Sequence, residues 1–477
     1  MLGPPSHIGG RHPGPLYYWF VTFVYALSGQ DLYISNIIFV ICKFVGLFFL
    51  FLTLNIITNN SKNKKLILIA LLIVLLSPLY IKVFRMHWQS NFLFIASSFA
   101  FLVTVLFIKY KWQVLGLYIF GLSCLFQSHL SSVPVLAGLG SLGLLVLFFR
   151  KNYQILDSKN KVLFFQVLPL VFTTIIWSPV IYNELFLTSN FKMVFQLHSD
   201  PYITKAGPFL AFSYLIEFFS GFILASKASL VRQELYAVVF YIVSFISLIF
   251  IFLKKQERVW HILLFLLPMF FCVLAVSSFR IPIYVHYFNS LIALPVLIFA
   301  FIIWNLLVSL EDKNLNSKIK IFPFIILVFF FIIFANNLKK TFTAKTFDID
   351  QEFYTLAHSK ELSEIINKDA AGSKVKLYTR LGSKYMTNSY YYFLNQNSHR
   401  FMEYNKFFRE LSAFKKVKRS EREKDLKIYS IICPRPYERD RKNILRNIKK
   451  YNKEEYQLDL SECKTCSSCT VSRLVKD

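Results

Sequence analysis

Residues 34–57 read ISNIIFVICKFVGLFFLFLTLNII, an apolar run whose single charged residue is Lys43. A helix needs a run of this length and composition to cross the roughly 30 Å hydrocarbon core of a bilayer. Because that core offers the backbone no hydrogen-bond partner, the run is predicted to span as a helix. Membrane insertion is therefore expected to decide the fold.

Nine further apolar runs follow within the first 338 residues. Most have the length of about 17–25 residues that a spanning helix needs, which predicts an α-helical multi-pass membrane protein with about ten spans. Two runs are short, so one of them could be re-entrant. The predicted spans are 34–57, 66–81, 91–108, 112–127, 132–149, 162–180, 235–253, 259–276, 287–308 and 321–338.

Composition divides the chain in two. Charged residues make up 17% of the 477 residues, against about 25% in soluble domains, and the shortfall lies before residue 338. We expect a membrane domain over 1–338 and a soluble domain over 339–477. The second part alternates helical patterns with strand patterns such as 374–380 and 427–433, which predicts a small α/β domain.

The orientation follows from the basic residues. If the first loop lies outside, the inner loops total 40 residues with 15 Lys or Arg, and the outer segments total 110 residues with 8. Such a bias is typical of cytoplasmic loops and fits ten alternating spans. It places residues 339–477 on the extracytoplasmic side, where their 30 basic and 18 acidic residues give a net charge of +12.

Residues 16–28 are apolar but too short to cross a bilayer. Tyr17, Tyr18 and Trp19 suit the headgroup layer, so we predict a helix lying in the outer interface and ended by Gly29. A second short aromatic stretch, 208–224, lies in the long outer loop 181–234. Together these segments are expected to roof the outer face.

Polar and ionisable residues gather at the predicted outer ends of the spans. Cations at headgroup depth attract phosphate, so a lipid-linked phosphate is one interpretation and ordinary contact with phospholipid headgroups is the other. Lys43 lies within a span and is a candidate by default, with snorkelling or pairing inside the bundle as the alternative. The candidates for phosphate contact are Arg11, His12, Arg85 and Arg280.

Cys463, Cys466 and Cys469 form a C-x2-C-x2-C pattern near the C-terminus. A metal or redox site is one interpretation. We favour a disulfide with one spare thiol in an oxidising compartment.

Three stretches together resemble the GT-C membrane glycosyltransferases, the relatives of protein mannosyltransferases and lipid A aminoarabinose transferases. They are GGRHPGPLYYWFVTFVYALSG at 9–29, GLSCLFQSHLSSVP at 121–134 and WSPVIYNEL at 177–185. The resemblance covers about residues 1–338.

This resemblance implies a polyprenyl-phosphate-sugar donor, displacement at the anomeric carbon, and an acceptor at the outer face that is a lipid, a glycan or a protein. Membrane lipids are expected partners and nucleic acid is not. No cofactor is predicted, although a divalent metal stays possible. The expected location is the bacterial inner membrane. The residues expected to line the cavity are Tyr17, Tyr18, Gln127, His129, Glu184, His286 and Tyr287.

The chain departs from the family in one respect. The family's catalytic acid lies early in the first outer loop, after a first membrane helix, whereas the first acidic residue here is Asp31. We therefore expect an N-terminally shortened sequence, with the catalytic carboxylate upstream and the activity of these 477 residues in question. The rival hypotheses are a polysaccharide polymerase or ligase, a transporter, and a non-catalytic glycan-binding protein.

Overall fold

The protein is described by a computed structural model in two compact units, Met1–Ala344 and Lys345–Asp477. The structure describes residues 16–29, 31–58, 64–75, 89–151, 153–156, 158–186, 207–221, 259–277, 288, 290–311, 320–321, 323–328, 331–332, 335, 356–371, 374–379, 426–432, 452–461 and 470–476.

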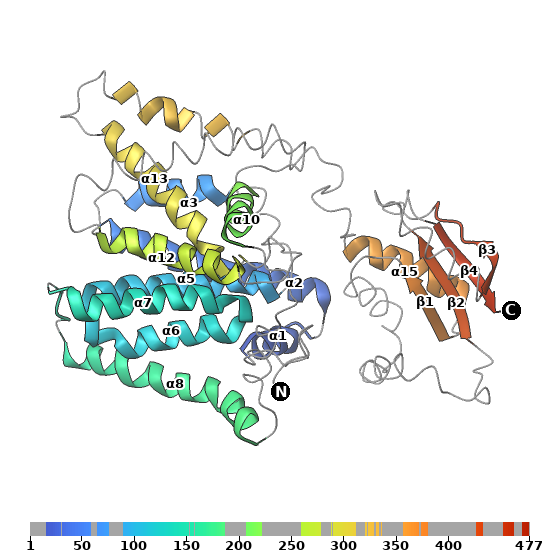
Figure 1. Ribbon diagram of the computed structural model, residues 1–477. Helices are drawn as coiled ribbons and strands as arrows, with labels where there is room; N and C mark the ends of the chain where they lie inside the picture. The colour runs from blue at the N-terminus through green and yellow to red at the C-terminus, as the bar shows by residue number, and fades with distance from the viewer. Residues whose placement is uncertain are drawn as a thin grey trace. The chain divides into compact units, whose positions relative to one another are not determined.

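The first unit is a bundle of helices (Figure 1). Among its described residues the elements are α1 (Leu16–Leu27), α2 (Leu32–Ile57), α3 (Lys64–Leu75), α5 (Gln89–Tyr110), the 3₁₀ turn η1 (Lys111–Val114), α6 (Leu115–Ser128), the 3₁₀ turn η2 (Leu130–Ser132), α7 (Val133–Phe149), α8 (Lys159–Phe186), α10 (Gly207–Gly221), α12 (Val259–Ser277) and α13 (Ala293–Glu311).

Five of the described helical stretches are long and apolar enough to cross a membrane: Ile37–Ile57, Phe92–Ser128, Asn160–Tyr182, Val259–Ser277 and Ala293–Glu311. The second of these is a hairpin rather than one rod. Lys111, with φ of 48°, turns the chain back between α5 and α6.

Seven predicted spans therefore coincide with described helices: 34–57, 91–108, 112–127, 132–149, 162–180, 259–276 and 287–308. The run 235–253 lies outside the described residues, and the runs 66–81 and 321–338 are described in part. The total of about ten spans stays a prediction. The segment 16–28 is a helix, as expected, in α1, and the described part of the aromatic stretch 208–224 is helical in α10.

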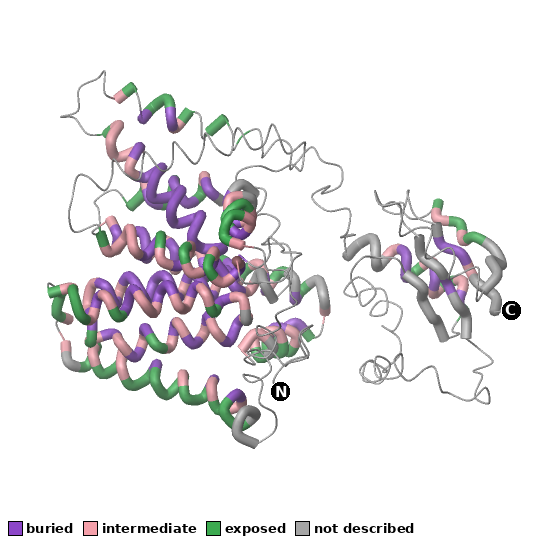
Figure 2. The backbone as a smooth tube through the Cα atoms, in the orientation of Figure 1, coloured by how far each residue is buried: buried purple, intermediate pink, exposed green. Residues whose placement is uncertain are grey.

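Helix α5 is the centre of the bundle. It contacts α2, α6, α7, α12 and α13. In an apolar 18-residue window of the hairpin that contains α5, 72% of the residues are buried, against 17% in the corresponding window of α8 (Figure 2). Its buried hydroxyls bond to its own backbone; Thr104 Oγ1, for example, donates to the Ala100 carbonyl at 2.7 Å. A helix with protein on every side can keep such polar groups, whereas α8 exposes apolar side chains such as Leu163, as a lipid-facing helix does.

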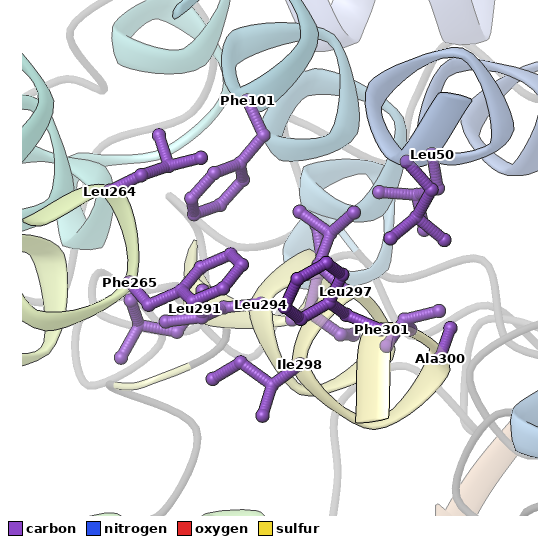
Figure 3. Close-up of a cluster of buried hydrophobic side chains, with 14 of the residues drawn as sticks. Leu50, Phe101, Leu264, Phe265, Leu291, Leu294, Leu297, Ile298, Ala300 and Phe301 are labelled. Carbon is purple, nitrogen blue, oxygen red and sulfur yellow. The ribbon is translucent and has the colours of Figure 1, made fainter. Parts of the chain in front are cut away.

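Figure 3 shows the apolar core where α5, α12 and α13 meet. Phe101 and Phe301 are almost wholly buried, and the ring centroids of Phe265 and Phe301 are 6.4 Å apart. Leu50 of α2 is buried as well. The core therefore joins segments that are distant in the sequence.

Aromatic side chains set the register of α6 against its neighbours. Tyr118 of α6 stacks on Phe107 of α5 with centroids 4.4 Å apart, and Phe120 lies 5.9 Å from Phe99. Since the residue numbers change in opposite senses, α5 and α6 are antiparallel. The Tyr118 hydroxyl also donates to the Leu139 carbonyl of α7 at 2.7 Å.

One end of the bundle collects basic loops. The backbone N–H of Gln154 donates to the Lys109 carbonyl at 2.9 Å, and Lys111 Nζ donates to the Leu147 carbonyl at 3.4 Å. The Leu156 N–H donates to Gln113 Oε1 at 2.6 Å. Two loops predicted to be cytoplasmic, 109–111 and 150–161, thus lie together. We call the end of the bundle that holds these two loops the basic end.

The second unit contains α15 (Leu356–Ala370) and a four-stranded sheet of order β1-β2-β4-β3. The strands are β1 (Lys374–Thr379), β2 (Leu426–Ile432), β3 (Asn452–Gln457) and β4 (Thr470–Lys476). β1 and β2 are parallel, and the other two pairs are antiparallel. The predicted strands at 374–380 and 427–433 are observed. The sequence did not predict β3 and β4.

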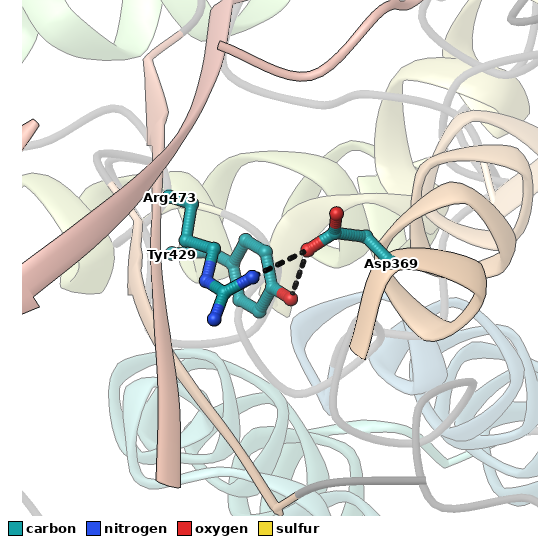
Figure 4. Close-up of polar contacts among 3 residues, drawn as sticks. All are labelled: Asp369, Tyr429 and Arg473. Carbon is teal, nitrogen blue, oxygen red and sulfur yellow. Dashed lines mark hydrogen bonds and ion pairs between the residues drawn. The ribbon is translucent and has the colours of Figure 1, made fainter. Parts of the chain in front are cut away.

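A polar cluster joins α15 to the sheet (Figure 4). Tyr429 of β2 is fully buried, and its hydroxyl donates to Asp369 Oδ2 at 2.5 Å. Arg473 Nη1 of β4 lies 4.0 Å from the same oxygen. The cluster holds the C-terminal end of α15 against two neighbouring strands. The three cysteines near the C-terminus lie outside the described residues.

Candidate functional site

Helix α1 crosses the beginning of α5, and it contacts both α2 and α6. The Phe20 ring centroid lies 5.4 Å from Phe39 of α2 and 4.9 Å from Phe92 of α5. Tyr17, predicted to line a cavity, lies 5.7 Å from Phe92. The aromatic residues of α1 therefore pack on the bundle, and they cover the end opposite to the basic end.

Hydrogen bonds fix the corner between α1 and α2. Gly29, with φ of +60°, ends α1 as predicted. Asp31 Oδ1 accepts from the N–H of Ile34 at 3.0 Å, which caps α2. The buried hydroxyls of Ser28 and Ser35 are 2.7 Å apart. Asp31 therefore has a structural role at the start of α2.

His129 lies in the turn between α6 and α7, at the same end as α1. The backbone N–H of Ser131 donates to His129 Nδ1 at 3.0 Å, and the Ser131 hydroxyl is 2.8 Å from that nitrogen. Because an amide can only donate, Nδ1 is an acceptor, which assigns the neutral ring its proton on Nε2. Ser290, which precedes α13, donates to the Ser131 carbonyl at 2.9 Å. We call the end of the bundle that holds α1, His129 and Ser290 the His129 end.

Gln127 is 1% exposed, and among the described residues neither its amide oxygen nor its amide nitrogen has a hydrogen-bond partner. Two turns earlier on the same face of α6, Phe120 lies 5.9 Å from Phe99 of α5 and 6.1 Å from Phe172 of α8. Gln127 therefore faces the space between α5 and α8. A buried unpaired polar group costs about 1–3 kcal/mol, so the position calls for a partner.

Lys43 is 3% exposed and lies on the face of α2 that packs against α5. Phe49 lies 5.1 Å from Phe99, and a Cβ at Gly46 would be 2.9 Å from Phe94. The residue numbers of α2 and α5 rise together from the first contact to the second, so the two helices run in the same direction. Lys43 precedes Gly46 by about one turn and is therefore level with the first turn of α5. Although it lies well inside the sequence of α2, it belongs to the His129 end.

The other predicted site residues are described less fully. Tyr18 and Glu184 lie in α1 and α8, but their side chains are outside the described part. The remaining predicted residues lie wholly outside it: Arg11, His12, Arg85, Arg280, His286 and Tyr287.

Described neighbours of these residues fall at one end of the bundle. Phe92, which follows Arg85 in the sequence, contacts α1. Phe288, which follows Arg280, lies 6.1 Å from Phe218 of α10 and close in sequence to Ser290. The predicted roles of the cations stay predictions.

A metal site is not visible in the part of the chain that the structure describes: it holds no group of three or more His, Cys, Asp or Glu residues placed to bind an ion. At the His129 end the described residues include a buried amine, a buried amide and an imidazole, those of Lys43, Gln127 and His129.

Comparison with known proteins found no matching family model and no matching curated protein. Among solved structures, the chain is similar to the crystal structure of ArnT from Cupriavidus metallidurans bound to undecaprenyl phosphate. The TM-score is 0.54 at 10% sequence identity, over 98% of this chain and 89% of that one. At this identity the likeness concerns the fold. With its five apolar helical stretches, the chain is an integral membrane protein that has the GT-C fold.

Proposed function

We propose that the protein is a membrane glycosyltransferase that moves a sugar from a polyprenyl-phosphate donor to an acceptor at the outer face of the membrane. The observation that carries the proposal is the His129 end. There α1, the start of α5, the end of α6 and the turn before α13 gather polar groups beneath an aromatic helix. The similar fold of ArnT bound to undecaprenyl phosphate supports the class of donor.

The outer location of this end is part of the proposal. The loops 109–111 and 150–161, which are rich in Lys and Arg, lie together at the opposite end of the bundle. Basic loops of this kind stay on the cytoplasmic side. The His129 end would then face the extracytoplasmic side.

In the proposed reaction, the bond between the anomeric carbon and the donor phosphate breaks while a bond to the acceptor oxygen forms. A carboxylate takes the acceptor's proton, and cations stabilise the departing lipid phosphate. We assign no described residue as that base. The proposed phosphate contacts are Arg11, His12, Arg85 and Arg280, with Lys43 added because of its level in the bundle.

Binding tests the proposal without requiring turnover. The full chain in lipid nanodiscs is expected to bind undecaprenyl phosphate, and Arg85→Ala and Arg280→Ala are each expected to weaken binding at least tenfold. Lys151→Ala is the matched control, because Lys151 is an exposed cation at the basic end. Unchanged affinity in both arginine variants would remove their assignment, and failure of the unaltered chain to bind the lipid would remove the proposed function.

A further inference from the structure

We propose that Gln127 binds a hydroxyl group of the sugar that the lipid donor carries, and so helps to select the sugar rather than the lipid phosphate. The inference rests on the proposed function and adds to it a specific contact. It starts from the buried amide at the end of α6, whose two polar atoms lack a hydrogen-bond partner within the described part of the chain.

The polar groups next to Gln127 are already used. Ser128 Oγ donates to the Cys124 carbonyl at 2.6 Å, and Ser132 Oγ donates to the His129 carbonyl at 2.6 Å. His129 Nδ1 accepts from Ser131. These hydrogen bonds fold the turn itself. The Gln127 amide takes no part in them, so it is not needed to build the turn between α6 and α7.

The chemistry of an amide decides which ligand group it fits. A carboxamide offers N–H donors and a carbonyl acceptor side by side. A phosphate oxyanion offers acceptors alone, so the carbonyl would meet it without a hydrogen bond. A sugar hydroxyl both donates and accepts and can therefore satisfy both halves of the amide. Lipid tails can satisfy neither half.

Gln127 and Lys43 both lie at the His129 end. Lys43 on α2 and Gln127 on α6 lie on helices that flank α5, and α1 contacts both of those helices. A cation suits the phosphate and an amide suits the adjoining sugar. Beside Gln127 in the sequence, Phe126 stacks on Trp177 of α8, with centroids 5.1 Å apart and an interplanar angle of 21°.

Other buried groups do not offer the same combination. Among the described residues, Asn55 lacks a partner for its Oδ1 and Trp304 for its Nε1. Both residues lie in the later turns of helices that run from the His129 end toward the basic end. Gln127 differs because neither of its polar atoms has a partner within the described part of the chain and because it lies at the end with α1. Asn55 thus provides a matched control.

The test compares Gln127→Met, which keeps the length of the side chain without its amide, with the unaltered full chain in nanodiscs. The probes are undecaprenyl phosphate and its mannosyl and aminoarabinosyl derivatives. We expect the unaltered chain to prefer one sugar-bearing lipid, and Gln127→Met to lose about tenfold for that lipid, as one or two hydrogen bonds imply. Binding of undecaprenyl phosphate should be unchanged in Gln127→Met and in Asn55→Leu.

A second measurement separates ligand binding from a structural role. If the amide lacks a partner until the sugar binds, ligand-free Gln127→Met should melt at the same temperature as the unaltered chain or higher. A lower melting temperature with an unchanged sugar preference would overturn the inference, as would an unaltered chain with no sugar preference. Gln127→Glu keeps the shape of the side chain but lacks the N–H donors of the amide. It takes the place of Gln127→Met if the Met variant fails to fold. An unaltered chain that binds no lipid phosphate would instead contradict the proposed function.

Discussion

Gly138→Ala is expected to destabilise the bundle because α7 and α12 approach each other at this glycine. A Cβ at position 138 would lie 2.6 Å from both the Cα and the nitrogen of Pro268. Ordinary contacts of a Cβ begin at about 3.4 Å, so the two backbones would have to separate by roughly 0.8 Å. A backbone atom cannot rotate away as a flexible side chain can. Overpacking of this kind costs about 1–3 kcal/mol.

Gly140→Ala is the matched variant. Position 140 lies in the same helix, and a Cβ there would meet no described atom within 4 Å. Alanine is favoured over glycine in a helix interior by about 1 kcal/mol, a gain that both variants share. The difference between them therefore isolates the steric cost, and Gly138→Ala should be less stable than Gly140→Ala by about 1–3 kcal/mol.

Equilibrium unfolding of the full chain by sodium dodecyl sulfate in mixed micelles measures this difference. We expect Gly140→Ala to be the most stable, the unaltered chain to follow, and Gly138→Ala to be the least stable. The unaltered chain and Gly138→Ala differ by less than the steric cost, because alanine is favoured over glycine in the helix. Equal stability of the two variants would show that α7 and α12 do not meet at Gly138. The reasoning on their register would then be wrong.

Three further outcomes are expected. Tyr118→Phe removes the hydrogen bond to the Leu139 carbonyl and should lower the free energy of unfolding by about 1 kcal/mol in the same assay; no loss would mean that the bond does not form. Asp369→Asn should cost the second unit about 1–2 kcal/mol through the Tyr429 contact, measured by hydrogen exchange of β2, with no effect in the exposed control Asp459→Asn. Lys43→Met should weaken binding of undecaprenyl phosphate while Lys43→Arg retains part of it, and equal affinities would exclude Lys43 from the site.

Most of the helices could be predicted because membrane insertion leaves a strong signal in the sequence. An apolar run long enough to cross the bilayer seldom forms anything but a spanning helix, so 34–57 and 162–180 predicted α2 and α8 closely. Boundaries were harder where apolarity continues past a helix end. The run beginning at 287 predicted a helix from that residue, but α13 begins at Ala293, after residues that include a 3₁₀ turn.

The strands β3 and β4 show what hydrophobic patterns miss. β3 reads NKEEYQ, which is too charged to suggest a strand by alternation. It lies at the edge of the sheet beside β4, where charged residues are common because they discourage pairing with other chains. Its strand conformation comes from its partner rather than from its own sequence.

The candidate site required packing information that a sequence does not contain. The motif around Gln127 indicated a cavity, but the lack of a described partner for its amide emerges once α5 and α8 are in place. Lys43 looked like a residue at the middle of a span. Its level at the start of α5 depends on the register between α2 and α5, which Gly46 and Phe49 set.

The central position of α5 has a consequence for how the protein responds to its bilayer. A change in hydrocarbon thickness acts on helices that touch lipid, which tilt or bend to match it. In this chain α8 is exposed along most of its length, whereas α5 is in contact with five other helices. Thickness should therefore tilt α8 before it disturbs α5 and the groups that depend on it. The proposed sugar contact, between α5 and α8, would then be sensitive to lipid composition through α8.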